Sequence, residues 1–297
     1  MLRFIFRTPT SVARLRLRSF TSQVRAVSSS MGSSSSHQSN PSWKVEKYTP
    51  SAMEWPYTQG DFERDDESPD SEFYSSPKFV THIDENAVEN LSRYYDHVLP
   101  KEGTVLDFCS SWVSHYPDRI KDDSRLRVFG LGLNQAELDH NPFFGPAEEK
   151  RRLVQDLNID PDLSQAFAPD VQFDASTCTV SIDYLSKAVQ VLSSLRRRTK
   201  ENGSVHLAIS NRAFWHKVVR RWMEVNERGR LELVGDYLWF SGWREVEIVT
   251  IVDVKSDNGS ERYSQSFMGI NSREQSNDPL WVVRAKNVKS LGEEAVL

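Results

Sequence analysis

From residue 81 onward the sequence alternates between two hydrophobic periods, and this alternation limits the fold more than any other feature of the chain. Short apolar runs typical of buried strands are separated by stretches whose apolar residues recur at helical spacing. Strands that alternate with helices form a parallel sheet with helices on both faces. The expected strands are residues 104–108, 126–130, 153–155, 174–180 and 205–210.

Two helices are marked by their ends as well as by their apolar faces. Asp84 is a typical N-cap for the first helix, which stops before Pro100. Asn202 and Gly203 follow the second helix, which connects the fourth and fifth strands. Their apolar faces consist of Val88, Leu91, Tyr95 and Val98, and of Ala188, Val191, Leu192 and Leu195.

The region after the fifth strand predicts helices first and then a hairpin. Residues 214–226 and 231–240 have helical spacing, whereas 245–254 and 280–285 carry the β-branched and aromatic residues of strands. With no helix between them, the last two strands should pair as an antiparallel hairpin on the sheet edge. The expected fold class is α/β, a doubly wound, Rossmann-like, seven-stranded and mostly parallel sheet with a C-terminal antiparallel hairpin and helices on both faces.

The first thirty residues differ in kind from the rest of the chain. Arginines interrupt short apolar runs every few residues, and no acidic residue occurs before Glu46. This pattern is typical of an organellar transit peptide, here residues 1–27, although a basic amphipathic helix on a membrane surface is the alternative. The arginine density and the Arg-Ser-Phe-Thr-Ser segment at 18–22 favour the mitochondrial matrix, with the plastid as the second choice.

Three further segments flank the domain, which is expected to span 81–287. Residues 28–42 form a serine-rich linker without periodicity and should be disordered, as should the tail at 288–297. Residues 43–80 form an aromatic and acidic arm that cannot fold alone but has enough aromatic surface to lie on the domain. The arm could line or cover a substrate pocket, or it could pack on the outside of the sheet.

Composition excludes several classes of protein. With 297 residues, of which 38% are hydrophobic, the chain can bury one sizeable core but hardly two. A formal charge of -5 argues against a general nucleic-acid-binding protein. No apolar run approaches the roughly 20 residues of a membrane span. Cys109 and Cys178 lack metal-binding spacing, so no metal is expected; their strands are neighbours, so the thiols could oxidise, but buried unreactive cysteines are commoner.

The segment from Val105 to Pro117 has the pattern of a buried strand that runs into a loop. In a doubly wound domain, nucleotide-type ligands are held at such a turn, and glycines there normally let backbone amides approach the ligand. The loop at 109–115 contains no glycine.

The order of segments from Phe79 to Ala285 resembles that of class I S-adenosylmethionine-dependent methyltransferases, in the broad small-molecule group called type 11. Val105-Leu106-Asp107 is similar to the family's first strand and its terminal acid, and Ser-Ser-Trp-Val-Ser-His at 110–115 resembles the loop of one subgroup. The resemblance implies S-adenosylmethionine as cofactor and a small molecule as methyl acceptor. Segments similar to the later strands and helices are 128–138, 154–158, 173–185 and 202–205.

This resemblance implies roles for residues after the first strand. Asp107 would lie near the methionine amino group, directly or through water. Ser110 and Ser111 would offer hydroxyls and amides to the methionine carboxylate or to the ribose. The two serines can replace part of what glycine provides, but not its freedom in φ.

The second strand departs from the family pattern. The family usually ends this strand with an acid that accepts both ribose hydroxyls, but the run Gly130-Leu131-Gly132 puts Gly132 at that place. Asn134, two residues later, could contact the ribose. It could also cap the following helix together with Glu137, and the two roles are compatible.

The other expected cofactor contacts come from the third and fourth strands. Asp156 sits where the family reads the adenine amino group, and a solvent-exposed strand end is the alternative. Leu157, Val180 and Ser181 complete the expected cofactor-binding set, as residues at the ends of these strands.

A general base helps methyl transfer when the acceptor must lose a proton. His82, His115 and Asp183 are the candidates nearest to the expected crevice, and a packed or surface side chain is the alternative for each. Most of the rate would come from alignment of the acceptor, methyl group and sulfur in a dry site.

Two functions from different classes remain. The first is a methyltransferase that acts on a small molecule, without nucleic acid and without a membrane span. The second is a non-catalytic relative that keeps the fold as a mitochondrial assembly or scaffold factor, as the missing glycines and the missing ribose acid suggest. The sequence leaves the methyl acceptor and the oligomeric state open.

Overall fold

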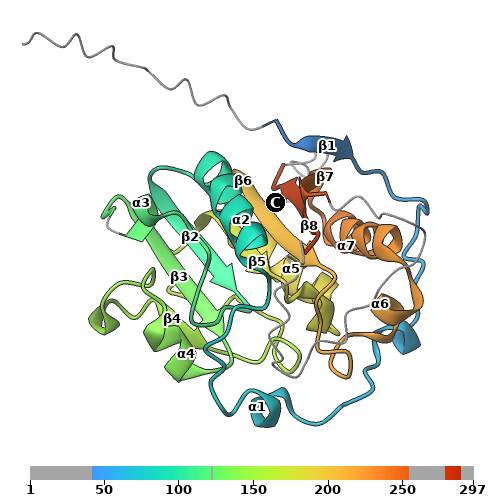
Figure 1. Cartoon of the computed structure of the whole chain (residues 1–297), viewed down its shortest axis with the longest axis horizontal. Helices are drawn as coiled ribbons and strands as arrows, with labels where there is room; N and C mark the ends of the chain where they lie inside the picture. The colour runs from blue at the N-terminus through green and yellow to red at the C-terminus, as the bar shows by residue number, and fades with distance from the viewer. Residues whose placement is uncertain (1–41, 122, 254–277, 289–297) are drawn as a thin grey trace, which may run out of the picture. The chain divides into compact units, whose positions relative to one another are not determined.

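The computed structural model describes residues 42–121, 123–253 and 278–288 (Figure 1). The predicted transit peptide, linker and tail lie outside these residues, apart from Ser42 and Val288. The strands are β1 (Lys44–Lys47), β2 (Gly103–Phe108), β3 (Leu126–Gly132), β4 (Arg152–Val154), β5 (Phe173–Thr179), β6 (Thr199–Ser210), β7 (Arg244–Val252) and β8 (Leu280–Lys286). The helices are α1 (Asp70–Phe73), α2 (Glu85–Val98), α3 (Asp118–Lys121), α4 (Gln135–His140), α5 (Ala188–Arg197), α6 (Arg220–Glu224) and α7 (Glu227–Phe240), with 3-10 turns η1 (Gln59–Phe62), η2 (Ala147–Glu149) and η3 (Ile182–Tyr184).

The strands form one mixed sheet in the order β1-β7-β8-β6-β5-β2-β3-β4. Strands β2 to β6 pair in parallel, β8 is antiparallel to both β6 and β7, and β1 is antiparallel to β7. The predicted Rossmann-like, mostly parallel sheet with antiparallel C-terminal strands is therefore confirmed. It has eight strands rather than the predicted seven, because the arm contributes β1. For the same reason the predicted hairpin does not form the sheet edge, since β1 covers β7.

Helices cover both faces of this sheet because side chains alternate along its strands. In β2, Val105 joins a core that includes Leu91 of α2, whereas Leu106 and Phe108 join a second core that includes Leu192 of α5. Figure 1 views the sheet from the side on which α2 lies across it. None of the helices in the described ranges is long and apolar enough to cross a membrane.

The predicted helix at 214–226 is much shorter in the structure, where only α6 is helical. The backbone N–H of Val219 donates to the carbonyl of Asp183 at 3.0 Å, and that of Arg220 donates to the carbonyl of Glu63 at 2.8 Å. Neighbouring segments thus use the amides that a helix would need. In contrast, α7 begins four residues earlier than predicted, because the Asn226 side chain accepts from the N–H of Gly229 at 3.0 Å.

The arm follows the sheet edge first and then crosses the ends of the central strands (Figure 1). After β1, the hydroxyls of Tyr48 and Tyr57 donate to the two carboxylate oxygens of Asp236 in α7, at 2.5 and 2.8 Å. Residues 64–80, the crossing segment, then bind Asn134 and Asn158, which follow β3 and β4. The arm therefore adds an edge strand to the sheet and covers the carboxyl ends of its central strands.

Candidate functional site

The strand order reverses between β2 and β5, which lie side by side in the parallel part of the sheet. From β2 the sheet continues to β3 and β4, and from β5 it continues to β6. In doubly wound sheets a crevice opens outside the carboxyl ends of the strands at such a point. The loops after Phe108 and Thr179 lie at this point, which is here called the crevice after its place in the fold, and most of the candidate residues lie on them or nearby.

The backbone is strained on both sides of the crevice. Cys109, directly after β2, has a φ of 53°, and Val180, directly after β5, has a φ of 44°. This left-handed region is rare for residues other than glycine and exceptional for β-branched valine. His115 at the end of the same loop has a φ of 55°. The loop that lacks glycine thus adopts glycine-like conformations anyway, and such strain tends to cluster at functional sites.

The buried carboxylate of Asp107 organises the loop from below. It accepts hydrogen bonds from the hydroxyls of Ser110 at 2.7 Å, Ser114 at 2.6 Å and Thr177 at 3.1 Å. Asn141 donates to the hydroxyl of Ser114 at 2.9 Å, which ties the loop to the end of α4. Burial raises the pKa of Asp107 to about 6, although the three hydroxyl bonds act in the opposite direction.

The end of β3 has no room for the acid that the family places there. A Cβ atom at Gly132 would overlap the backbone carbonyl oxygen of Ser110, and one at Gly130 would overlap the ring of Phe144. The N–H of Ser110 donates to the carbonyl of Leu131 at 2.8 Å, so the loop is held directly on β3. The close approach of the loop therefore leaves no space for any side chain at position 132.

Asn134 caps α4 and binds the arm as well. Its side-chain oxygen accepts from the N–H of Glu137 at 3.1 Å, and its side-chain nitrogen donates to the carbonyl of Tyr74 at 2.8 Å. The buried Glu137 does not reach back to Asn134. Its carboxylate accepts from the hydroxyl of Ser111 at 2.7 Å and from the N–H of Lys78 at 2.6 Å.

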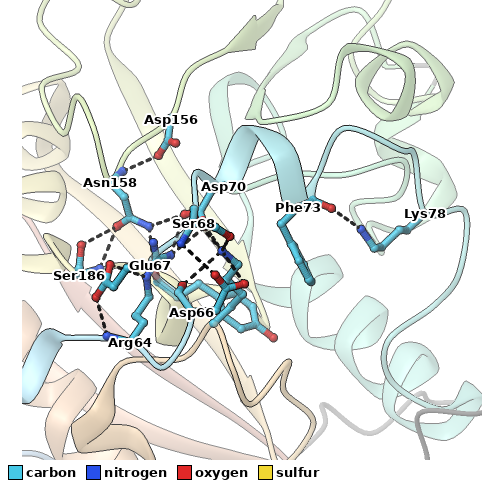
Figure 2. Close-up of polar contacts among 12 residues, drawn as sticks. Arg64, Asp66, Glu67, Ser68, Asp70, Phe73, Lys78, Asp156, Asn158 and Ser186 are labelled. Carbon is cyan, nitrogen blue, oxygen red and sulfur yellow. Dashed lines mark hydrogen bonds and ion pairs between the residues drawn. The ribbon is translucent and has the colours of Figure 1, made fainter.

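An ionic cluster around the buried Asp70 and Lys217, here called the latch, fixes the crossing segment to the domain (Figure 2). It consists of Arg64, Asp66, Ser68, Asp70 and Lys217. The Arg64 guanidinium contacts both oxygens of Asp70, at 3.0 and 2.8 Å. The fully buried ammonium of Lys217 donates to the Ser68 carbonyl at 2.8 Å and lies 3.1 and 3.3 Å from the carboxylates of Asp66 and Asp70. Four of these five residues belong to the arm, so the latch joins it to the domain.

The residues after β4 meet the latch. Asn158 donates to Asp70 at 2.9 Å, and its side-chain oxygen accepts from the N–H of Ser186 at 2.9 Å (Figure 2). Asp156 is half-buried and accepts from the N–H of Asn158 at 2.9 Å, so it shapes its own turn. The neighbouring Leu157 is buried in the core on the α5 side of the sheet.

Aromatic side chains of the arm lie over the crevice. The ring of Phe73 packs edge-on against Phe214 at 5.3 Å, and Phe214 packs against Tyr184 at 5.9 Å. Burial and then the charges of Asp70 and Asp183 raise the pKa of the Tyr74 hydroxyl far above its ordinary value.

Trp112 of the loop points toward the arm. Its indole N–H donates to the carbonyl of Val80 at 3.1 Å, and its ring packs edge-on against Phe79 at 6.2 Å. Trp112 thus joins the loop to the end of the crossing segment.

The three candidate bases lie around this crevice with shifted pKa values. Burial raises the pKa of Asp183 to about 7, while a hydrogen bond from its own backbone N–H and the charge of Arg230 lower it. Burial and then the charge of His82 lower the pKa of His115 to about 4. The ring of His82 packs against Phe214 at 5.4 Å, and partial desolvation lowers its pKa. A carboxyl that titrates near neutral pH suits proton transfer better than a histidine held neutral.

The structure thus brings several predicted residues together and engages them with one another. Ser181 and Asp156 instead bond within their own turns; the Ser181 hydroxyl donates to the carbonyl of Thr179 at 3.0 Å. Sequence reasoning missed Asn141, Thr177 and the latch. None of these shows a periodic signal, and the acidic run at 65–70 was the only indication of the latch. Within the described ranges, no group of three or more His, Cys, Asp or Glu side chains is arranged to hold a metal ion.

No family model matches the sequence, and no curated protein is similar to it in sequence. Solved structures of methyltransferases are among those similar to part of the chain. A chain of the complex between the Haloferax volcanii Trm112 methyltransferase activator and a methyltransferase is 13% identical, with a TM-score of 0.45, over 69% of this chain and 92% of that chain. An S-adenosylmethionine-dependent methyltransferase from Archaeoglobus fulgidus is 15% identical, with a TM-score of 0.43, over 67% of this chain and 92% of that chain.

Haemonchus contortus phosphoethanolamine N-methyltransferase 2, in complex with S-adenosyl-L-methionine, is 15% identical with a TM-score of 0.41. The match covers 68% of this chain and 52% of that chain, about half of its length. All three TM-scores are below 0.5, so the fold assignment rests on the strand order and register given above. The fold is Rossmann-like.

Proposed function

We propose that this chain is an S-adenosylmethionine-dependent methyltransferase that acts on a small molecule. The observation that carries the proposal is the pair of left-handed residues Cys109 and Val180, one after each of the two strands that flank the switch point. Strain of this kind, about 1–3 kcal/mol for each residue, persists where the surrounding structure needs it and is common at ligand sites. Asp183, whose pKa is raised to about 7, adds a titratable group at the same place.

With the crossing segment in place, the crevice residues do not fit an adenosyl group. Asn134 is bound to the Tyr74 carbonyl, and Gly132 leaves no space for a ribose-binding acid. Asp107 already accepts three hydroxyl donors. Only the Asn134 bond depends on the arm, so we propose that residues 64–80 leave the carboxyl ends of the strands, and that Ser110 and Ser114 turn away from Asp107, before a ligand of this kind binds.

The residues of the chain itself would then act in two ways. The rings of Tyr184 and Phe214 would exclude water from the crevice, which favours alignment of the reacting groups. The Asp183 carboxyl would accept a proton from a hydroxyl or amine acceptor near neutral pH. His115, held neutral by burial, would be available as a hydrogen-bond partner.

Calorimetric titration of the full chain with S-adenosylmethionine tests this proposal. We expect weak binding to the native chain and tighter binding to Asp66→Asn, because loss of the 3.1 Å ion pair with Lys217 loosens the latch. The matched control is Asp123→Asn, which removes an exposed partner of Arg125 and should leave binding unchanged. Absence of binding to both the native chain and Asp66→Asn at millimolar ligand would contradict the proposal.

The second candidate is a non-catalytic protein that uses this fold as a mitochondrial assembly or scaffold factor. The overlap between position 132 and the Ser110 carbonyl favours it, because displacement of the arm does not remove that overlap. This candidate predicts no methyl transfer to any component of a matrix extract. It also predicts that, on a native gel of an extract, the chain migrates as part of a larger assembly. Transfer of a radiolabelled methyl group would exclude it.

Localisation in the mitochondrial matrix is a proposal that stands on the first 27 residues alone. Fusion of this segment to a fluorescent protein should direct the reporter to mitochondria. A second fusion in which the six arginines of the segment are replaced by glutamine is the control and should stay outside. Delivery of the first fusion to plastids, or to no organelle, would contradict the proposal.

A further inference from the structure

A hollow of about 660 Å³ lies between the first part of the arm, the start of α5 and the end of α7, and it borders the latch through Glu67 and the turn after β4 through Ser186. Pockets that bind small molecules typically measure about 300–1,000 Å³, so the hollow is large enough for one. Its walls include five aromatic residues, Trp55, Tyr57, Phe62, Tyr237 and Phe240.

The aromatic wall offers ring faces to a planar molecule. Trp55 is stacked on Phe62 with a centroid distance of 5.8 Å and packs edge-on against Tyr57 at 4.9 Å and Phe240 at 5.4 Å. The side chain of Trp55 remains 37% exposed, so it is the ring that an incoming molecule meets first. Aromatic pairs contribute about 0.5–1.5 kcal/mol beyond the area that they bury.

The opposite side of the hollow is the N-terminal end of α5. Ala188, Val189 and Gln190 form its first turn and line the hollow, and the N-cap residue Lys187 makes no side-chain cap bond. A helix start without a cap leaves amide N–H groups and a partial positive charge. Lys187 is itself part of the lining, and its ammonium donates to the carbonyl of Ile159 at 3.0 Å.

The two acidic residues of the lining each lie beside an arginine and are more than half exposed, so water screens their charges. Glu63 pairs with Arg220 at 2.7 Å, and Glu67 lies 3.7 Å from the Arg64 guanidinium. The hollow therefore presents aromatic faces on one side and the positive end of α5 on the other. That combination suits an aromatic molecule with a negatively charged oxygen group.

The hydroxyl of Tyr237 gives an independent indication of a ligand. It is buried, and it finds no hydrogen-bond partner among the described residues. The neighbouring Tyr48 and Tyr57 both donate to Asp236, which shows that this region satisfies its other hydroxyls. Tyr237 lines the hollow, and its ring centroid lies 6.4 Å from that of Trp55. A buried polar group without a partner costs about 1–3 kcal/mol, which an oxygen atom of a ligand would recover.

We propose that this hollow binds a small planar aromatic molecule that carries a carboxylate. The ring lies against Trp55, and the carboxylate faces the start of α5 and accepts from the Tyr237 hydroxyl. Trp55 shifts to give access to that hydroxyl. This inference concerns binding alone and does not depend on methyl transfer at the crevice.

Titration of the full chain with three matched probes tests the proposal: 2-naphthoate, uncharged 2-naphthylmethanol and the cation 2-naphthyl-trimethylammonium. We expect 2-naphthoate to bind at least about tenfold more tightly than either of the others, as one charge-assisted contact allows. Its binding should also change the tryptophan fluorescence, and this change should be lost in Trp55→Phe. Absence of 2-naphthoate binding, or equal or tighter binding of either other probe, would overturn the proposal.

Three variants locate the site. Tyr237→Phe should weaken 2-naphthoate binding about tenfold while the protein stays folded, because the hydroxyl makes no bond in the free protein. Val189→Trp should weaken it further by filling the hollow. Tyr94→Phe removes a buried hydroxyl that binds His206 elsewhere, and it should leave the affinity unchanged. An unchanged affinity in both Tyr237→Phe and Val189→Trp would overturn the proposed location.

Discussion

The crevice and the hollow differ in how their polar groups are satisfied. At the crevice, Asp107 accepts three hydroxyl donors, and Asn134 and Glu137 bind the backbone of the arm. At the hollow, the Tyr237 hydroxyl has no partner among the described residues, and no side chain caps α5. The site that the strand order predicts is thus closed by the protein itself. The hollow, which the sequence pattern does not indicate, contains polar groups without a partner among the described residues.

The largest effect should come from the latch that closes the crevice. Lys217→Met leaves the buried carboxylate of Asp70 without one of its cations and should lower the free energy of unfolding by about 4 kcal/mol. Denaturant unfolding measures this change, and limited proteolysis should show earlier cleavage within residues 64–80. The control Arg228→Met removes partners of the exposed Glu46 and Glu232 and should cost less than about 1 kcal/mol. Equal losses in both variants would show that the latch does not hold the arm.

The next effect should come from the contact between the loop and β3. Gly132→Ala places a methyl group against the Ser110 carbonyl, which is backbone and cannot rotate away, and should cost about 2–3 kcal/mol. Gly60→Ala is the matched control, because a Cβ there meets no atom closer than 3.7 Å. Denaturant midpoints compare the two variants. If they unfold alike, the position at the end of β3 is open to a side chain after all.

The pH dependence of stability should report the burial of Asp183. Its pKa rises from 3.8 to about 7 on folding, so its stabilising contribution is complete below about pH 4 and is lost as the pH rises toward 7. The stability of the native protein relative to Asp183→Asn should therefore fall by about 1.4 kcal/mol for each pH unit in that range. Chemical unfolding at a series of pH values measures the difference.

Asp162 provides a control of opposite sign. Hydrogen bonds from Ser164 and Ser194 lower its pKa to about 2, so its contribution is present above about pH 4 and is lost as the pH falls toward 2. The stability difference between the native protein and Asp162→Asn should thus be constant above about pH 4 and shrink only in the acidic range. A constant stability difference between the native protein and Asp183→Asn would mean that water reaches Asp183.

The smallest effect compares two tyrosines of the hollow. Tyr57→Phe loses the 2.8 Å hydrogen bond to Asp236 and should cost about 1 kcal/mol. Tyr237→Phe removes a hydroxyl without a partner and should leave the free energy of unfolding unchanged or slightly raised. Thermal unfolding of both variants checks this. A larger loss for Tyr237→Phe would mean that its hydroxyl is already bonded.

Much of the fold could be predicted because it depends on periodicity. The five parallel strands and α5 follow from runs of apolar residues that bury one or both faces. β1 could not be found in this way, because Lys44–Lys47 is an exposed edge strand and forms by pairing with β7. The predicted helix at 214–226 failed for a similar reason, since the amides of Val219 and Arg220 bind distant carbonyls.

The location of the candidate site could be predicted from the sequence, but the contacts among its side chains could not. The strand order locates the crevice, and Asn134 carries the sequence signal of a cap. Its side-chain nitrogen also donates to the Tyr74 carbonyl. These two residues are 60 positions apart in the sequence, and no local pattern encodes such a contact. The latch likewise joins residues 64–70 to Lys217. Polar contacts between distant segments are thus what sequence reasoning could not supply.

The overlap between position 132 and the Ser110 carbonyl has a consequence for inheritance. A mutation to an acid at 132 fails while the loop lies on β3, because the Ser110 carbonyl fills the space that the side chain needs. A change in the loop alone leaves a glycine at 132. The two positions should therefore vary together among related sequences, since each change is favourable only with the other.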